Sequence, residues 1–452
     1  MEESRSFFKK ALSNLSFLFF GGVLSAFFIF ATQVILAREL NASGFGNFMA
    51  ALASITLLAP LAVFGVTQSW LKLYGIEGIG ANRWVNITLK LLVITFVLSF
   101  MILILWAFFG PHNPEFKFIL LGLLPLVISH IFIELVNTRF QLEGRYKALA
   151  LWQNLMLLLR FGFVTTSMVL LVKPLSISSV VFGYSSISIL VSLVGYFLLS
   201  PMIKGKIKLN IPMSNQFKTN KRVLKKLRIS DIFFHSLPYG LATLFYLIYL
   251  QSDLIFLKYL VNDAAAGIYA AAFTILISIY FIPGVIYNKF LLPKIHGWAN
   301  HDQPKLLKIY QGGNGLMLIL GLLILVIFFF STPLIIPIIF GSEYLDTSKI
   351  LSILLFCIPI RFLATSIESP LYTKDLMKWK TGSMGIAAAL NIVLNLMLIP
   401  SYSYYGAAVA TLISEFVVLI LYLLVVTKKL FGANAWRGWT NGFNSSFWKS
   451  IS

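Results

Sequence analysis

Long apolar runs recur along the whole chain, and this feature constrains the fold more than any other. A helix that crosses the hydrocarbon core of a bilayer needs about 20 apolar residues. Runs of that length lie at residues 16–36, 45–66, 88–109, 118–136, 149–171, 177–200, 232–257, 264–288, 314–331, 350–371, 382–400 and 406–427. Because lipid offers no partner for backbone N–H and C=O groups, such runs must be helical. The sequence therefore predicts an all-α integral membrane protein with about twelve transmembrane helices.

Composition argues against a soluble protein and against a nucleic-acid-binding one. Apolar residues make up 58% of the chain and charged residues 12%, whereas a soluble domain carries roughly 25% charged residues. The net charge is +20, but a nucleic-acid-binding protein needs a folded polar surface that this chain lacks. The single cysteine, Cys357, excludes an intramolecular disulfide and a thiolate metal cluster. No GxxxxGK[ST] motif occurs, so neither a nucleotide nor another cofactor is expected.

The distribution of Lys and Arg predicts the topology, since cytoplasmic loops collect these residues. With the N-terminus in the cytoplasm, 29 of the 36 basic residues fall in cytoplasmic segments and five in outer segments. The remaining two, Arg160 and Arg361, lie inside predicted helices. This asymmetry predicts a multi-pass protein of a cytoplasmic membrane with both termini in the cytoplasm, and it accounts for most of the positive charge.

A basic segment at residues 201–230 divides the apolar runs into two sets of six. It predicts a cytoplasmic linker between an N-terminal six-helix lobe (1–200) and a C-terminal six-helix lobe (231–429), with its cations close to anionic lipid headgroups. Residues 430–452 contain three tryptophans, which favour the headgroup zone, so they predict an interfacial cytoplasmic tail.

Two further segments are interpreted from length and proline content. The first apolar run, from Phe17, is longer than the apolar region of a cleavable signal, so we expect it to be the first membrane helix. The stretch Thr332–Tyr344 contains Pro333 and Pro337 and is too short to cross a bilayer. It therefore predicts a re-entrant or interfacial segment.

The two halves of the chain resemble each other at a nearly fixed spacing, which predicts an internal repeat. At an offset of 220 residues, the pairs are Gln33 with Asp253 and Arg38 with Lys258. At an offset of 231 residues, the helical series His130, Glu134, Asn137 and Gln141 corresponds to Arg361, Thr365, Glu368 and Tyr372. Because each half holds an even number of helices, the repeat is parallel. The expected architecture is two pseudo-symmetric six-helix lobes around a central cleft.

Arg160 and Arg361 are the first candidates for a functional site, because an ionisable side chain at mid-membrane is costly and faces a cavity or a partner. Arg160 and Glu134 lie about 15 Å apart along the expected hairpin, which is too far for an ion pair. Two interpretations stay open: an arginine faces a watery central cavity, or it pairs with a carboxylate on another helix. Arg38 and Lys258 either snorkel to the interface or add to a positive cleft lining that suits phosphate.

Asp253, Glu368 and Glu134 are candidates for ion coupling, because a carboxylate in a low-dielectric setting can take up a proton or hold a cation. Asp253 and Glu368 are the stronger two, since both lie on polar helical faces. Ordinary hydrogen bonding between helices is the alternative for each. His130 and Glu134 have the i, i+4 spacing of metal ligands, but no further histidine or cysteine joins them, so no metal site is predicted.

Four stretches carry a resemblance to a known family: ARELNASGFGNF (37–48), LIYLQSDLIFLKYLVNDAAAGIYAAAF (247–273), PLIIPIIFGSEY (333–344) and NIVLNLMLIPSYSYYGAAVAT (391–411). Over nearly its full length the chain resembles the bacterial polysaccharide or O-antigen flippases of the multidrug, oligosaccharidyl-lipid and polysaccharide exporter superfamily. It departs from them at SYSYYG, which replaces a turn richer in glycine. Single basic residues vary within this family, so it supplies no fixed binding set.

The resemblance implies a flippase, not an enzyme, in the bacterial inner membrane. It implies that an undecaprenyl-pyrophosphate-linked oligosaccharide repeat moves from the cytoplasmic to the outer leaflet by alternating access, for O-antigen, lipopolysaccharide or capsule assembly. Partners would be membrane lipids, the lipid-linked oligosaccharide, coupled H⁺ or Na⁺ and polysaccharide assembly proteins. Arg38, Arg160, Lys258 and Arg361 are the predicted cations of the substrate cleft. The alternatives are a multidrug exporter of the same superfamily and a membrane-embedded polymerase or glycosyltransferase.

Overall fold

The protein is all-helical in its described part. The computed structural model describes residues 2–170, 175–209, 228–373 and 376–440, and no strand occurs in these ranges. Within them, eight helical stretches are long and apolar enough to cross a membrane, or nine if the bent pair Ser342–Leu354 and Cys357–Tyr372 forms one span. The predicted all-α membrane fold is confirmed, while the number twelve stays a prediction.

Two compact units divide the chain. One comprises Met1–Phe28 and Ala51–Leu247, and the other comprises Ile29–Ala50 and Ile248–Ser452. The division therefore runs within two long helices, α1 (Glu2–Val63) and α8 (Ile229–Leu260). The predicted lobes and the internal repeat stay predictions. Of the predicted linker and tail, residues 210–227 and 441–452 lie outside the described residues.

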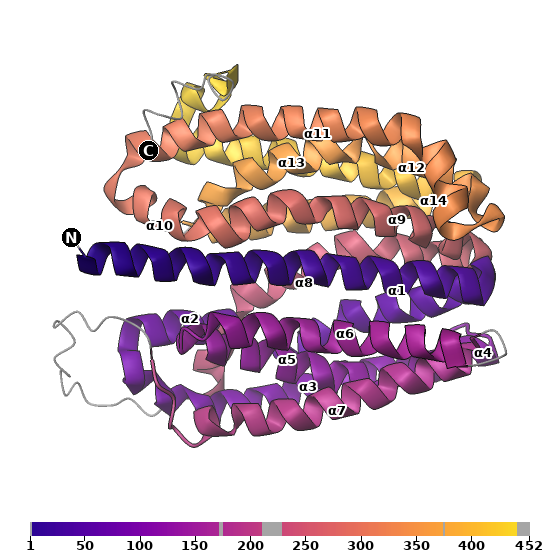
Figure 1. Ribbon diagram of the computed structural model, residues 1–452, viewed down its shortest axis with the longest axis horizontal. Helices are drawn as coiled ribbons and strands as arrows, with labels where there is room; N and C mark the ends of the chain where they lie inside the picture. Colours follow the sequence, from indigo (N-terminus) through magenta and orange to yellow (C-terminus); the bar gives the residue numbers. More distant parts are fainter. Residues whose placement is uncertain (1, 171–174, 210–227, 374–375, 441–452) are drawn as a thin grey trace. The chain divides into compact units, whose positions relative to one another are not determined.

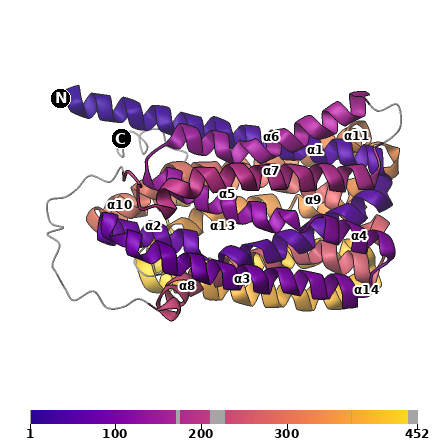
Figure 2. The ribbon, with the colours of Figure 1, turned by 90° about the horizontal axis from the view of Figure 1, so that it is seen from below.

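The first unit is built from a set of antiparallel helices with short connections. Its elements between the two long helices are α2 (Val66–Glu77), α3 (Asn82–Phe109), α4 (Pro114–Gly122), α5 (Pro125–Leu142), α6 (Tyr146–Leu170) and α7 (Ile177–Ile203). The three helices α5, α6 and α7 pack on one another and run side by side in both views (Figures 1 and 2). The side chains of Asn113 and Ser176 cap α4 and α7 by accepting from backbone N–H groups of the first turn.

The second unit is built around α13, which packs on α9, α11 and α14 (Figure 1). Its elements are α9 (Asp263–Gly284), a π-helical turn (Val285–Leu291), α10 (Leu292–His301), α11 (Gln303–Phe340), α12 (Leu345–Leu354), α13 (Cys357–Glu368), a 3₁₀ turn (Ser369–Tyr372) and α14 (Met377–Val426). Because α13 is central in this unit, its polar residues are held inside the protein.

Helices α1 and α14 each contain a break at a non-glycine residue with positive φ. Asn41 has φ 56° and Ser403 has φ 53°. Such a conformation is costly for an L-residue, and asparagine tolerates it best because its side chain can hydrogen-bond locally. The Asn41 side-chain oxygen accepts from the backbone N–H of Gly44 at 2.9 Å, so it caps the segment after the break. Each of these two helices is thus two segments joined at a tight bend.

Thr332–Tyr344, predicted as a re-entrant or interfacial segment, is not a separate element, so the expected break at its prolines is wrong. Helix α11 continues through Pro333 and Pro337 and ends at Phe340, so most of this stretch is the last part of one 38-residue helix. The last carbonyl groups of the helix accept hydrogen bonds from a residue far away in the sequence. The Arg38 guanidinium donates to the carbonyl of Ile338 and, at 2.7 Å, to that of Ile339. Proline rules consider only the local chain, whereas the guanidinium that stabilises this end comes from α1.

The polarity of the second unit is that of a membrane protein. Large apolar side chains form an exposed stripe along α11 at helical spacing, with exposed fractions of 55–75%: Leu323, Ile327, Phe330, Leu334 and Ile338. The buried interior instead holds ionisable side chains that are 8% exposed or less: Asp253, Glu368, Lys380 and Glu415. A soluble protein would have the reverse arrangement.

Candidate functional site

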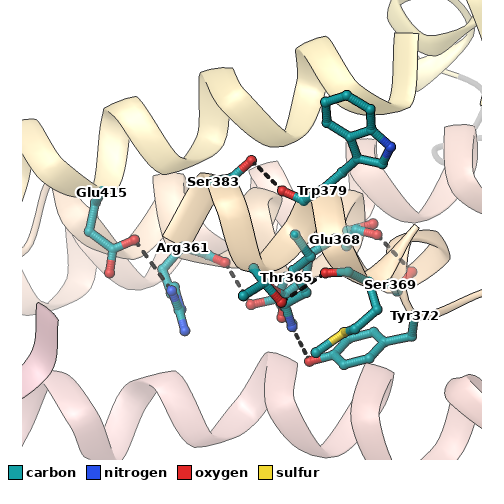
Figure 3. Close-up of polar contacts among 12 residues, drawn as sticks. Arg361, Thr365, Glu368, Ser369, Tyr372, Trp379, Ser383 and Glu415 are labelled. Carbon is teal, nitrogen blue, oxygen red and sulfur yellow. Dashed lines mark hydrogen bonds and ion pairs between the residues drawn. The ribbon is translucent and has the colours of Figure 1, made fainter. Parts of the chain in front are cut away.

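The polar face of α13 positions the centre of the candidate site. Arg361, Thr365 and Glu368 follow one another at i, i+4 and i+7, so they lie along one side of the helix (Figure 3). The Thr365 hydroxyl donates to the Arg361 carbonyl at 2.8 Å and is thereby satisfied within the helix. The two charged side chains are left to interact with neighbouring helices.

Arg361 pairs with a glutamate of α14. The nearest atoms, Nη1 of Arg361 and Oε2 of Glu415, are 3.7 Å apart, and the two side chains are 11% and 1% exposed. The Arg361 guanidinium also lies 5.7 Å from the ring centre of Tyr280 on α9. Figure 3 shows the carboxylate of Glu415 directed at Arg361. For this arginine, the structure supports the interpretation of pairing between helices.

Glu368 pairs with Lys380, which lies two residues before the predicted apolar run 382–400. The ion pair measures 3.3 Å and both side chains are almost fully buried. Lys380 also donates to the hydroxyl of Tyr372, and its ammonium lies 3.7 Å from the centre of that ring. Lys380 lies in the first turn of α14, so this helix begins earlier than the predicted apolar run, while the cytoplasmic location of Lys380 stays a prediction.

Asp253 is held by three neutral donors. Its carboxylate accepts from the Tyr269 hydroxyl at 2.6 Å, from the Thr411 hydroxyl at 2.5 Å and from the Asn395 amide at 2.6 Å. These donors come from α9 and α14, so the aspartate ties α8 to two other helices. The Asn395 amide thereby hydrogen-bonds to a residue of a neighbouring helix. These three hydrogen bonds offset part of the cost of burying the aspartate.

Lys258 and Arg38 are both engaged in the second unit. The Lys258 ammonium donates to Asn47 at 2.7 Å and to Asp263, while the Arg38 guanidinium binds the end of α11 as described above. Close to Arg38, the Glu343 carboxylate accepts from the backbone N–H of Ala42 at 3.0 Å. The structure thus gives both cations local partners beside the break in α1.

Arg160 and Glu134 belong to the first unit. The Arg160 guanidinium lies 4.4 Å from the ring centre of Tyr184 on α7, an arrangement that stabilises a buried cation. Its Nε is buried and makes no hydrogen bond within the described residues. Glu134 is half-buried on α5, and none of the ion pairs in the described part of the chain joins it to Arg160. This agrees with the separation expected along the hairpin.

The structure brings three of the four predicted substrate-binding cations into the second unit, while Arg160 belongs to the first. Two contacts of the site were not predicted: the pair of Lys380 with Glu368 and the pair of Glu415 with Arg361. In the described ranges, no group of three or more His, Cys, Asp or Glu residues lies close enough to hold a metal ion. Apolar helices that enclose ion pairs are typical of multi-pass membrane transporters, which need charged groups where solutes pass.

Comparison with known proteins identifies the family. Residues 11–294 match the family described as polysaccharide biosynthesis protein, and the chain belongs to this family. The resemblance found in the sequence is thereby confirmed. No curated protein matches the chain.

Solved structures share the fold at low sequence identity. The lipid II flippase MurJ, in an inward closed conformation, is 16% identical and superposes with a TM-score of 0.67 over 95% of this chain and 90% of its own. An inward-facing multidrug resistance MATE family transporter of the MOP superfamily is 14% identical, with a TM-score of 0.63 over 95% of this chain and 96% of its own. A MOP superfamily transporter from Pyrococcus furiosus is 12% identical, with a TM-score of 0.57 over 91% and 94%.

Proposed function

We propose that this protein is a flippase that moves an undecaprenyl-pyrophosphate-linked oligosaccharide repeat unit from the cytoplasmic to the outer leaflet of a bacterial inner membrane. The family, which is one of polysaccharide biosynthesis, and the fold shared with a lipid II flippase support this. The observation that carries the proposal is that two half-buried arginines, Arg160 and Arg361, lie within apolar helices, since a membrane-embedded cation suits the phosphate of a lipid-linked substrate.

In the proposed mechanism, two six-helix lobes open alternately to the two sides around a central cleft. Arg160 and Arg361 bind the pyrophosphate, and Arg38 and Lys258 extend the positive lining. The sugar occupies the cleft while the lipid tail stays in the bilayer. The protein acts in O-antigen, lipopolysaccharide or capsule assembly with other assembly proteins, and both termini are cytoplasmic. Arginine is suited to this role because its planar guanidinium can donate two hydrogen bonds to one phosphate.

A substitution of Arg160 tests the proposal. Arg160→Gln should slow transport at least about tenfold, because a hydrogen bond to a charged group contributes about 1.5–3 kcal/mol. Cells with this variant should accumulate lipid-linked oligosaccharide on the cytoplasmic leaflet, measured by the access of an impermeant sugar-oxidising or lectin probe. The matched control is Arg145→Gln, since the side chain of Arg145 is 54% exposed. Normal export by a well-expressed Arg160→Gln variant would show that this arginine does not bind the headgroup.

Asp253, Glu368 and Glu134 are the proposed residues for coupling transport to H⁺ or Na⁺. Asp253 is the strongest of them, because its buried carboxylate lies in a polar cluster with the Tyr269 and Thr411 hydroxyls and the Asn395 amide. In proteoliposomes, Asp253→Asn should abolish the stimulation of transport by one of the two gradients and leave the downhill movement of substrate in place. If both gradients still stimulate this variant as in the wild type, Asp253 does not couple transport.

Export of multidrug substrates is the second candidate function, because the MATE transporters share the fold at similar TM-scores. The charge of the interior distinguishes the two candidates, since a cationic drug needs an acidic or apolar cleft rather than arginine. For the Pyrococcus furiosus transporter, reverse polarity of the binding pocket is described as suggesting a different function. A polymerase or glycosyltransferase is not proposed, because the matched structures are flippases and transporters.

A further inference from the structure

Glu415 has fewer hydrogen bonds and a more distant cationic partner than the other buried acids of the second unit. Neither carboxylate oxygen accepts a hydrogen bond within the described residues. Its cationic partner, Arg361, is 3.7 Å away, which is too far for a hydrogen bond. By contrast, Asp253 accepts three hydrogen bonds, and Glu368 has a lysine at 3.3 Å. A buried carboxylate in such a site is costly as an anion, since desolvation is only partly offset.

Hydroxyl groups near this pair are also unsatisfied. Tyr249 of α8 and Tyr280 of α9 face the Glu415 carboxylate, and their buried hydroxyls make no hydrogen bond of normal geometry in the described part of the chain. Buried hydroxyls seldom lack a partner, and the group that these two face is the Glu415 carboxylate. Both tyrosines can donate to this carboxylate whether or not Arg361 is paired with it.

Arg361 is less enclosed than its partner. Its side chain is 11% exposed, whereas that of Glu415 is 1% exposed. The exposed part of the Arg361 side chain is where a ligand can reach it. Because Glu415 lies 3.7 Å from the guanidinium, with no hydrogen bond of normal length between them, a phosphate that binds Arg361 bidentately competes with the carboxylate for this cation. The carboxylate would then be a buried, unpaired anion unless it takes up a proton.

We infer that Glu415 and the phosphate of the substrate compete for Arg361, and that Glu415 takes up a proton when the substrate binds. This inference rests on the proposed flippase function and adds a role for a residue outside the predicted binding set. The proton comes from the aqueous side to which the site is open. When the headgroup leaves, Arg361 returns to Glu415 and the proton is released to water, so one proton accompanies each binding event.

The other titratable groups around Glu415 do not replace it in this role. Those that face it are Tyr249 on α8, Tyr280 on α9, Cys357, Arg361 and Glu368 on α13, and Tyr422 near Glu368 on α14. The ionisable residues of α12 lie elsewhere, since Asp346 binds Tyr404, three turns away along α14. Two further acids lie near it: Glu368 has its own lysine, and Asp253, which binds Thr411 one turn before Glu415, accepts three hydrogen bonds. The negative charge of Glu368 makes a second anion at Glu415 still less favourable.

Thermodynamic linkage between proton binding and substrate binding fixes the direction in which pH changes the affinity for substrate. If substrate binding brings one proton onto the protein, a lower pH must tighten binding, by up to about tenfold per pH unit. The full-length protein in detergent micelles is titrated with undecaprenyl pyrophosphate between about pH 6 and about pH 8. Glu415→Gln keeps the shape of the side chain and cannot titrate. This variant should bind as tightly at the high pH as at the low, apart from the titration of the ligand itself.

The control is Glu115→Gln, which makes the same change at an exposed position of α4 and should keep the wild-type dependence on pH. A steeper loss of affinity with pH in the wild type and in Glu115→Gln than in Glu415→Gln supports the inference. The same dependence in all three proteins overturns the inference and leaves the flippase function standing. If the wild type does not bind undecaprenyl pyrophosphate at any pH, the proposed function fails and the inference fails with it.

Discussion

Arg361→Gln should both abolish transport and destabilise the protein, and a second substitution should separate the two effects. Removing one partner of a buried ion pair leaves the other as an unpaired charge, at a cost of about 3–5 kcal/mol. Here the orphan would be Glu415, which is 1% exposed. The double variant with Arg361→Gln and Glu415→Gln has no unpaired charge at this position, so most of the stability should return. Transport should stay lost, because the cation that binds the headgroup is still absent.

The measurements are the thermal midpoint in detergent and transport in proteoliposomes. Arg145→Gln serves as the control for stability, since Arg145 is exposed and its partner Glu143 keeps Arg139 at 2.9 Å. Exposed pairs contribute at most about 1 kcal/mol, so its midpoint should change little. A double variant that regained transport together with stability would show that Arg361 only neutralises Glu415. A double variant as unstable as the single one would show that the pair is not the source of the stability.

The class of fold could be predicted from sequence because hydropathy reports directly on burial in lipid. Long apolar runs such as that in α11 leave a helix as the sole arrangement that satisfies the backbone. The end of α11 could not be predicted, because Pro333 and Pro337 weaken a helix locally. Arg38 offsets this from nearly 300 residues away. Contacts between distant segments decide such cases, and a single sequence does not report them.

Sequence reasoning identified part of the candidate site. The cost of burying a charge identified Arg361 without any structure. Its partner, Glu415, could not be predicted, because the spacing of the two residues along the chain does not show which faces of α13 and α14 meet. Lys380 was missed for another reason: it lies only a few residues from the loop, and boundaries of predicted helices are uncertain by about 2–4 residues. The ion pair with Glu368 explains why this lysine is buried.

Gly46→Ala should destabilise the second unit, whereas the same change at a helical glycine with free space around it should not. A Cβ atom at Gly46 would fall well inside the contact distance of the Asp263 carbonyl oxygen, and one at Gly267 would clash in the same way with the carbonyl of Ala42. Both obstacles are backbone atoms, which cannot rotate away. Overpacking of this kind costs about 1–3 kcal/mol for a small group, and Gly46→Leu should prevent accumulation of folded protein.

The matched control is Gly162→Ala, because no atom lies within 4 Å of a Cβ built at Gly162 in α6. That variant should gain up to about 1 kcal/mol from the higher helix propensity of alanine. The close approach of Gly46 to Asp263 also brings Asn47 and Asp263 to the two sides of Lys258, so Gly46→Ala should disturb this lysine as well. Equal thermal midpoints for Gly46→Ala and Gly162→Ala would contradict the close packing of α1 on α9. A lower midpoint for Gly46→Ala alone would show that the two helices meet through backbone contact at Gly46.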